Sequence, residues 1–192
     1  KFTNQKTGYK CDPTGWYISE KYDGVRAVWN GSNFISRQNK KYNAPEWFKN
    51  IMPPGRSLDG ELHCGKGGFQ LATGITRHLI PNDKDWTKII FQVFDVPDPN
   101  LVNIPFSERI PHIKDLVEES CIKWNIIQLP QDCVKPKACP LQMADQILIK
   151  DMNSAYKIYK ESILAGAEGV MLRKPDSKYE FKRSKTLLKW KP

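Results

Sequence analysis

The chain has 192 residues, a formal net charge of +9 and 40% hydrophobic residues, six of them tryptophan. That length and apolar content suffice for one sizeable core and exclude a disordered polar tail. No window approaches 18 consecutive apolar residues, so the sequence predicts no membrane span. The positive charge favours a polyanionic partner such as nucleic acid or a nucleotide.

The cysteines and histidines do not form a metal or disulfide pattern. The five cysteines include no Cys-x-x-Cys pair, and none of the three histidines has a partner at helical metal-ligand spacing. We therefore expect reduced thiols, without a zinc site or a disulfide framework.

The first half of the chain has the pattern of strands and turns. Alternating apolar and β-branched residues predict strands at 16–21, 25–29, 33–37, 57–63 and 88–95. Asn30-Gly31 is a strong hairpin signal between the second and third of these strands. The glycine-rich run 65–68 predicts a loop, and 69–79 a helix.

The second half mixes helices and strands. Pro105 precedes apolar residues at helical spacing, which predicts a helix there. The three prolines in 121–140 predict an irregular connection with one strand at 122–129. A further helix is expected from an N-cap at Asn153 to Gly166, followed by strands at 168–173 and 186–191. This order is not a regular βαβ alternation and favours an α+β fold with antiparallel sheets.

The most informative segment is Glu20-Lys21-Tyr22-Asp23-Gly24-Val25-Arg26. A lysine becomes a covalent nucleophile when it loses its proton and an electrophile is held in line with it. Asp-Gly is also a common hairpin-turn dipeptide, so this segment alone favours a surface turn flanked by a salt bridge.

Five more segments follow in order: Ile35-Ser36-Arg37, Leu58-Asp59-Gly60-Glu61-Leu62, Phe91-Gln92-Val93-Phe94-Asp95, Glu168-Gly169-Val170-Met171-Leu172-Arg173 and Leu187-Leu188-Lys189-Trp190-Lys191-Pro192. Together with the lysine segment they resemble the covalent nucleotidyltransferases, which comprise ATP-dependent DNA ligases, RNA ligases and mRNA-capping guanylyltransferases. The resemblance runs from Trp16 to Pro192 and is greatest to the small ATP-dependent DNA ligases of bacteria, phages and viruses.

The resemblance implies one adenylylation domain over residues 1–192. Its fold would be a two-lobed, ATP-grasp-like α+β nucleotidyltransferase, with antiparallel sheets flanked by helices and a nucleotide cleft between them. ATP would load AMP onto Lys21, which would pass it to the 5′-phosphate of nicked double-stranded DNA. A neighbouring 3′-hydroxyl would then displace AMP and seal the nick, as DNA repair and DNA replication require.

The resemblance also assigns roles to the residues around the lysine. Lys21 would be the nucleophile, and Asp23 would serve the steps on nicked DNA. Arg26 and Arg37 would contact the nucleotide and the 5′-phosphate of the nick, because a guanidinium suits bidentate phosphate recognition. Ordinary exposed strand arginines are the alternative.

The later motifs would complete the nucleotide site. Glu61 would accept a hydrogen bond from the ribose, and Glu168 would bind Mg²⁺ or Mn²⁺; strand-face glutamates are the alternative. Phe94 would stack on adenine, unless it is plain core. Lys189 and Lys191 alternate with apolar residues, so they share a face and would neutralise the α-phosphate. A charged outer strand face is the alternative.

Three further positions carry weaker signals. The resemblance implies that Ser19 and Glu20 recognise the base, largely through their backbone. Asp95 is interpreted as structural. The basic cluster 182–185 fits either a phosphate track or a solvated tail.

Full-length members of this family continue into an OB-type domain, which is expected to be absent here. We therefore expect slow self-adenylylation, weak nick sealing and salt-sensitive DNA binding. A monomer without membrane association is expected, in an intracellular compartment that contains DNA: cytoplasm, nucleus or organelle.

Three alternatives remain at this point. A capping guanylyltransferase shares the lysine segment, although the Leu-Asp-Gly-Glu-Leu context favours a DNA ligase. An RNA ligase is less favoured, since those enzymes commonly lack the arginine after Asp-Gly-x. A nucleic-acid-binding platform that has lost catalysis is the third.

Overall fold

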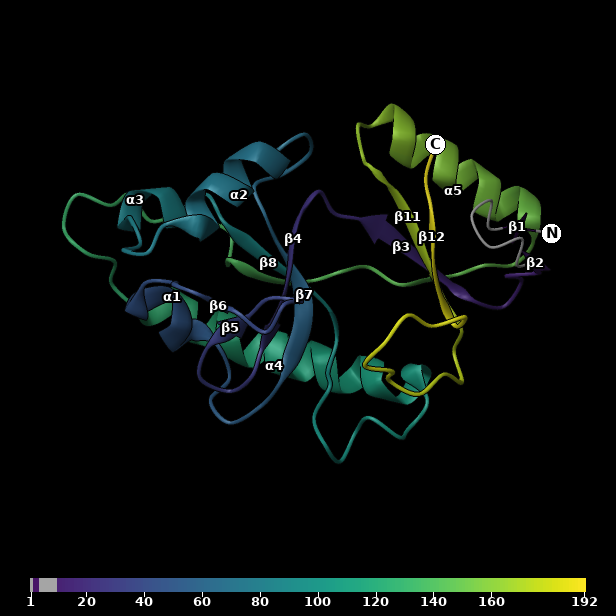
Figure 1. Cartoon of the computed structure of the whole chain (residues 1–192), viewed down its shortest axis with the longest axis horizontal. Helices are drawn as coiled ribbons and strands as arrows, with labels where there is room; N and C mark the ends of the chain where they lie inside the picture. Colours follow the sequence, from purple (N-terminus) through teal and green to yellow (C-terminus); the bar gives the residue numbers. More distant parts are fainter. Residues whose placement is uncertain (1, 4–9) are drawn as a thin grey trace.

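The computed structural model describes residues 2–3 and 10–192, which form two lobes of unequal size (Figure 1). The larger lobe is built on a six-stranded sheet in the order β6 (Lys41–Tyr42), β5 (Phe34–Ile35), β4 (Gly24–Trp29), β7 (Leu58–His63), β8 (Ile90–Asp95) and β9 (Leu141–Met143). The smaller lobe contains a four-stranded sheet in the order β10 (Ile147–Leu148), β3 (Tyr17–Lys21), β11 (Gly169–Arg173) and β12 (Leu187–Trp190). A separate pair joins β1 (Phe2–Thr3) to β2 (Lys10–Cys11).

The described residues form five helices. The larger lobe carries α1 (Glu46–Ile51), α2 (Phe69–Arg77), α3 (Asp83–Trp86) and the long α4 (Phe106–Ile126), and the smaller lobe carries α5 (Met152–Leu164). Helix α4 packs on β8 and β9, α2 on β4 and β7, and α5 on β11. Each lobe therefore has its own hydrophobic core, which confirms the two-lobed α+β prediction.

Within residues 2–3 and 10–192, the strands pair antiparallel everywhere except at one position. Strands β8 and β9 run parallel, a pairing that the prediction of an α+β fold with antiparallel sheets did not include. Parallel neighbours need a long crossover, and α4 lies between these two strands in the chain. The predicted hairpin at Asn30 is confirmed: β4 pairs with β5, and Asn30 Oδ1 accepts from the backbone nitrogens of Ser32 and Asn33 at 3.0 and 2.8 Å.

Two local predictions in the second half were wrong. Residues 122–129 do not form a strand, because α4 continues to Ile126. The buried positions Val117, Ser120 and Trp124 are three and four residues apart, which is helical spacing.

The second error concerns the start of α5. Asp151, not Asn153, is the N-cap, and its Oδ1 accepts from the backbone nitrogen of Ser154 at 2.7 Å. Gly166 does follow the end of this helix, with a φ of +94° that favours glycine.

A buried carboxylate joins the two lobes. Asp95, at the end of β8, is 0% exposed and binds Arg109 of α4 through two contacts of 2.8 and 3.1 Å. It also pairs with Arg173 of β11, in the other lobe, at 2.8 Å. The interpretation of Asp95 as structural agrees with this position.

The segment between β11 and β12 folds back on the larger lobe (Figure 1, yellow). The Ser177 carbonyl accepts from Arg109 Nη1 and from the Phe106 backbone nitrogen, both at 2.9 Å. The Tyr179 backbone nitrogen donates to the Val102 carbonyl at 2.9 Å. The lobes are therefore connected by backbone contacts as well as by the ion pairs.

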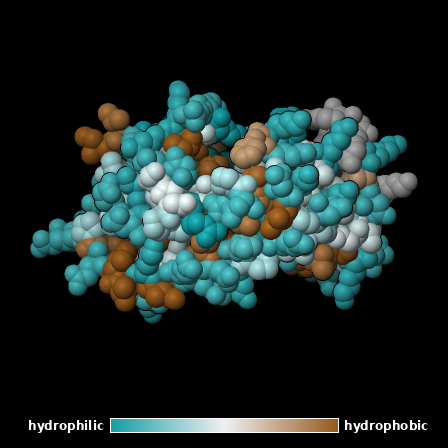
Figure 2. Space-filling view, turned by 90° about the horizontal axis from the view of Figure 1, so that it is seen from below, coloured by the Kyte–Doolittle hydropathy of each residue, from teal (hydrophilic) through white to brown (hydrophobic). Residues whose placement is uncertain are grey.

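The outer surface is mostly polar. On the face in Figure 2, hydrophobic residues form separate patches, several of them toward the end that belongs to the larger lobe. Exposed apolar residues of that lobe include Leu79, Ile80, Ile126 and Val134. Among the residues that the structure describes, no helix is long and apolar enough to cross a membrane.

The Asp95 ion pairs predict a large effect on stability. Asp95→Asn removes the charge but keeps the volume, and it leaves two guanidinium groups buried without their counter-ion. We expect the free energy of unfolding in urea to fall by about 3–5 kcal/mol. Asp176→Asn, at an exposed carboxylate 3.7 Å from Lys174 Nζ, should change it by less than about 1 kcal/mol. Equal small effects of both variants would contradict this account of the interface between the lobes.

Candidate active site

The segment that carries Lys21 passes from one lobe to the other. Lys21 ends β3 in the smaller sheet, and Gly24 begins β4 in the larger sheet, so the hairpin interpretation of Asp23-Gly24 was wrong. A Cβ atom at Gly24 would lie 2.1 Å from the Leu62 carbonyl oxygen, so this crossing requires glycine. The glycine therefore brings the lysine segment directly against β7.

Lys21 is held by an acidic side chain from the neighbouring strand. Gly169 of β11 is paired with Lys21, which brings the preceding residue, Glu168, beside the lysine. Glu168 Oε2 accepts from Lys21 Nζ at 2.5 Å, and Glu168 Oε1 lies 3.6 Å from Lys191 Nζ. One carboxylate thus bridges two of the predicted lysines.

The main cavity, about 550 Å³ in volume, lies between the lobes. Eight of the eleven predicted site residues line it: Ser19, Glu20, Lys21, Arg26, Arg37, Glu61, Phe94 and Lys189. Asp23 and Glu168 line a second cavity instead, and Lys191 reaches the site through Glu168. The sequence motifs therefore converge in space although they span most of the chain.

The main cavity combines positive charge with apolar surface. Its charged lining residues are five cations, Lys21, Arg26, Arg37, Arg173 and Lys189, and two acids, Glu20 and Glu61. Its apolar lining includes Phe94, Phe106, Met171 and Leu187. Phe94 is partly exposed to this space rather than enclosed in the core. Such a cavity suits an anion that carries a flat apolar ring.

Arg26 is oriented by a residue that we did not single out from the sequence. The buried Asp59 binds the Arg26 guanidinium through two contacts, 3.1 Å to Nε and 2.7 Å to Nη2. Asp59 also accepts from the Tyr179 hydroxyl at 2.6 Å, and burial together with this carboxylate raises the pKa of Tyr179. The guanidinium carbon lies 5.6 Å from the centre of the Phe94 ring. The only signal in the sequence was the position of Asp59 within the Leu-Asp-Gly-Glu-Leu motif.

Glu61 lies in a strongly perturbed environment. Burial raises its pKa to about 7, partly offset by the Gly24 backbone N–H, which donates to Oε2 at 3.3 Å, and by the charge of Lys21. At neutral pH this carboxyl group therefore exists in both protonation states.

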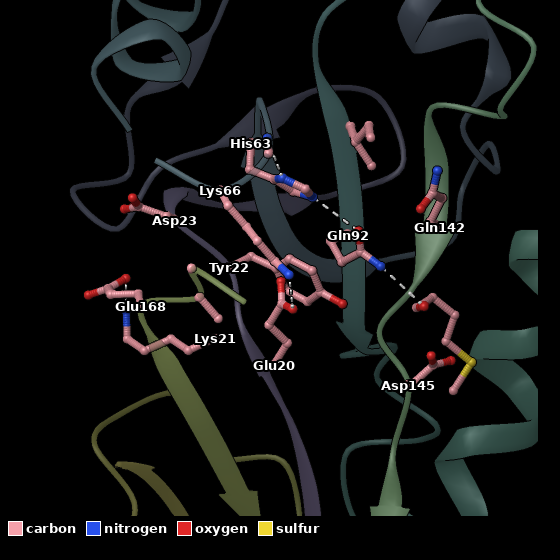
Figure 3. Close-up of a pocket in the computed structure, with 15 residues that line it drawn as sticks. Glu20, Lys21, Tyr22, Asp23, His63, Lys66, Gln92, Gln142, Asp145 and Glu168 are labelled. Carbon is pink, nitrogen blue, oxygen red and sulfur yellow. Dashed lines mark hydrogen bonds and ion pairs between the residues drawn. The ribbon is translucent and has the colours of Figure 1, made fainter. Parts of the chain in front are cut away.

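The second cavity, about 430 Å³ in volume, also borders the lysine segment, and Figure 3 shows the residues that line it. Glu20, Lys21 and Tyr22 line both cavities. The four acids of the second cavity, Glu20, Asp23, Asp145 and Glu168, outnumber its two lysines, Lys21 and Lys66. The charge balance is thus opposite to that of the main cavity.

A chain of hydrogen bonds forms one wall of the second cavity (Figure 3). The Gly65 N–H donates to His63 Nδ1 at 3.0 Å, so Nε2 carries the proton and donates to Gln92 Oε1 at 3.0 Å. Gln92 Nε2 donates in turn to the Met143 carbonyl at 3.2 Å. Burial lowers the pKa of His63, which keeps this ring neutral.

The carboxylates do not form a protein-built metal cage. Within the described residues, no group of three or more His, Cys, Asp or Glu side chains is placed to hold a metal ion. Glu168 offers one carboxylate beside the lysine. This donor set fits Mg²⁺, which usually takes one or two protein carboxylates and completes its shell with water and substrate phosphates.

Comparison with known proteins gives a consistent result. The family model described as "ATP dependent DNA ligase domain" matches residues 2–191. A DNA ligase of Haemophilus influenzae is 32% identical over 179 residues, which is 92% of this chain and 58% of that protein. The chain therefore spans somewhat more than half the length of this relative.

Solved structures agree with the fold. A Lig E DNA ligase, described as binding DNA with a minimal scaffold, superposes with a TM-score of 0.78 at 27% identity, over 99% of this chain and 66% of that one. The Chlorella virus DNA ligase-adenylate superposes with a TM-score of 0.70 at 24% identity, over 92% of this chain and 61% of that one. The second likeness supports the fold alone.

Glu61 predicts a pH-dependent stability. The folded protein holds the Glu61 proton more tightly than the unfolded chain, so this group's stabilising contribution is lost as pH rises from about 4.5 through about 7. Glu61→Gln cannot ionise. As the pH rises from about 5 to about 8, wild type should therefore lose stability relative to Glu61→Gln. The difference between their free energies of unfolding should change by roughly 1–3 kcal/mol in favour of the variant. Chemical denaturation at each pH measures this, with the exposed Glu161→Gln as control; parallel profiles for wild type and Glu61→Gln would refute it.

Proposed function

The chain belongs to the family of ATP-dependent DNA ligase domains, and we propose that it transfers AMP from ATP to Lys21 and from Lys21 to nicked DNA. One observation carries the proposal: Lys21 lines a basic cavity that is also lined by aromatic and aliphatic side chains. ATP is an anion with a flat purine, and it matches both properties.

The first step forms a bond between Lys21 and phosphorus. Lys21 Nζ attacks the α-phosphorus, a P–N bond forms, and the P–O bond to pyrophosphate breaks. The lysine must first give up a proton, and Glu168 Oε2, at 2.5 Å from Nζ, is placed to accept it. Glu168 would hold Mg²⁺ or Mn²⁺, and the bound metal would supply additional positive charge at the reacting phosphate.

Other residues of the main cavity would bind the nucleotide. The base would lie between Phe94 and Met171, with Ser19 and Glu20 on the adjacent strand. Glu61 is placed between Gly24 and the cavity, and in its ionised form it would accept from a ribose hydroxyl. Arg26 and Lys189 would face the phosphates from opposite lobes, and Lys191 would act beside Glu168.

The later steps involve DNA. An oxygen of the 5′-phosphate would attack the AMP phosphorus, break its bond to Lys21 and form a phosphoanhydride. A 3′-hydroxyl would then attack the 5′-phosphate, form the phosphodiester and release AMP. We assign Asp23 to these steps and Arg37, which is exposed beside the main cavity, to the 5′-phosphate. We propose a monomer that acts on nicks in a DNA-containing compartment, in repair or replication.

A covalent adduct is the direct test of the first step. Incubation with Mg²⁺ and ATP labelled at the α-phosphate should label wild type with an acid-labile, alkali-stable bond, as a lysyl phosphoramidate requires. Lys21→Ala should abolish the label, because it removes the nucleophile. Lys114→Ala, on the outer part of α4, should leave it unchanged. Labelling by GTP in place of ATP would indicate a guanylyltransferase, and no adduct with either nucleotide would leave only a binding role.

The DNA partner predicts a salt dependence. Each phosphate neutralised by the protein contributes about 0.9 to the slope of log K against log salt concentration. The 182–185 cluster lies in the segment between β11 and β12, so we propose that it follows the phosphate backbone. Lys182→Ala with Arg183→Ala should lower the slope by about 1–2 in fluorescence anisotropy with nicked DNA. The matched pair Lys157→Ala with Lys160→Ala on α5 should preserve it; equal slopes for all three proteins would exclude the cluster.

A further inference from the structure

Four strands place one row of side chains across the smaller sheet. Met171 of β11 is paired with Ser19 of β3 on one side and with Lys189 of β12 on the other. Ile147 of β10 is paired with Ile18, so the same antiparallel register brings Gln146 opposite Ser19. Residues directly opposite in a sheet point to the same face. All four side chains of this row line the main cavity.

The two ends of this row differ chemically. Lys189 is a cation at one edge, whereas Gln146 is a neutral amide at the other. The apolar Met171 lies between them, on the same cavity wall as Leu187, and Phe94 enters from the larger lobe. Neighbouring strands lie about 4.8 Å apart, and the strand of Ser19 lies between Gln146 and Met171. The backbones at these two residues are therefore about 10 Å apart, and their side chains extend across part of that gap. A ring held over Met171 therefore meets the Gln146 amide at its edge.

The Gln146 amide is incompletely satisfied. Its Oε1 atom is buried and has no hydrogen-bond partner among the described residues. Buried carboxamide oxygens normally have a donor, so a lone one in a cavity wall points to a donor supplied by a ligand. The terminal torsion of glutamine is broad and roughly two-fold, which allows the amide to turn its oxygen toward the cavity without a backbone shift.

A carboxamide distinguishes the two purines. It offers one acceptor and one donor side by side, and adenine presents the complementary pair, a donor at the 6-amino group and an acceptor at N7. Guanine presents two acceptors, O6 and N7, so the amide oxygen would remain unpaired. We propose that Gln146 is a specificity-determining residue that binds the 6-amino group and N7 of adenine and selects ATP over GTP. This inference rests on the proposed function, since it places ATP in the main cavity.

Two nucleotide analogues test each hydrogen bond separately. Purine riboside triphosphate lacks the 6-amino group, and 7-deaza-ATP lacks the N7 acceptor. Calorimetric titration with EDTA present measures binding without AMP transfer. We expect wild type to bind each analogue about 5- to 100-fold more weakly than ATP. Gln146→Leu should bind ATP as weakly as the analogues, with no further loss on either.

Gln146→Glu separates the two contacts. A carboxylate keeps the acceptor and loses the donor, so this variant should still prefer ATP over purine riboside triphosphate but not over 7-deaza-ATP. Gln142→Leu, at an amide in the second cavity, is the matched control and should keep the wild-type pattern. A merely structural role of Gln146 would weaken all nucleotides alike and would not remove the difference between them.

The outcomes separate this inference from the proposed function. An adduct with ATP, together with analogue penalties that persist in Gln146→Leu, would overturn the role of Gln146 and leave AMP transfer intact. Suppose that the weaker binding of the analogues disappears in Gln146→Leu, but wild type forms no covalent adduct with ATP. That result would support the role of Gln146 and reject the transfer of AMP to Lys21. Wild type that binds ATP and both analogues equally, or binds no ATP, would also overturn the inference.

Discussion

Asp95 sets the distance between the two lobes, because its carboxylate binds an arginine from each. Arg109 belongs to the long helix of the larger lobe, and Arg173 ends an inner strand of the smaller sheet. All three charges are almost completely removed from solvent, where an unpaired charge is strongly unfavourable. Separation of the lobes would leave such charges unpaired. The main cavity therefore lies between two lobes that these ion pairs hold together, and Arg173 itself lines it.

A second buried carboxylate that binds an arginine orients side chains of the main cavity. Asp59 lies on β7 beside the end of β8, and it holds Arg26 in place while Tyr179 approaches from the segment after β11. The guanidinium is consequently fixed over Phe94. The buried carboxylates Asp59 and Asp95 thus position the arginines of the cavity wall. These contacts explain how a site built from both lobes retains a defined geometry.

The sequence predicted the outline of this arrangement because its motifs are local patterns. Lys21, Glu61 and Phe94 stand on strands that alternation identifies, and the resemblance of the ordered motifs to a known family implied that they share one site. Asp59, Met171 and Gln146 were missed because their importance comes from partners distant in sequence, such as Tyr179 and Ser19. The same limit explains the strand wrongly expected at 122–129: its isoleucines suit a strand locally, but Trp124 extends the buried face of α4.

Lys21 lies between two cavities of opposite charge, and this position bears on the proposed chemistry. The basic cavity would attract the triphosphate of the proposed substrate, whereas Glu168 lines the acidic cavity, and Lys21 lines both. An incoming anion stabilises the ammonium form, which alone would oppose nucleophilic attack. The adjacent carboxylate counters this difficulty, since it offers the departing proton an acceptor at 2.5 Å from Nζ. Lys21 can therefore meet an anionic substrate in one cavity and a proton acceptor that lines the other.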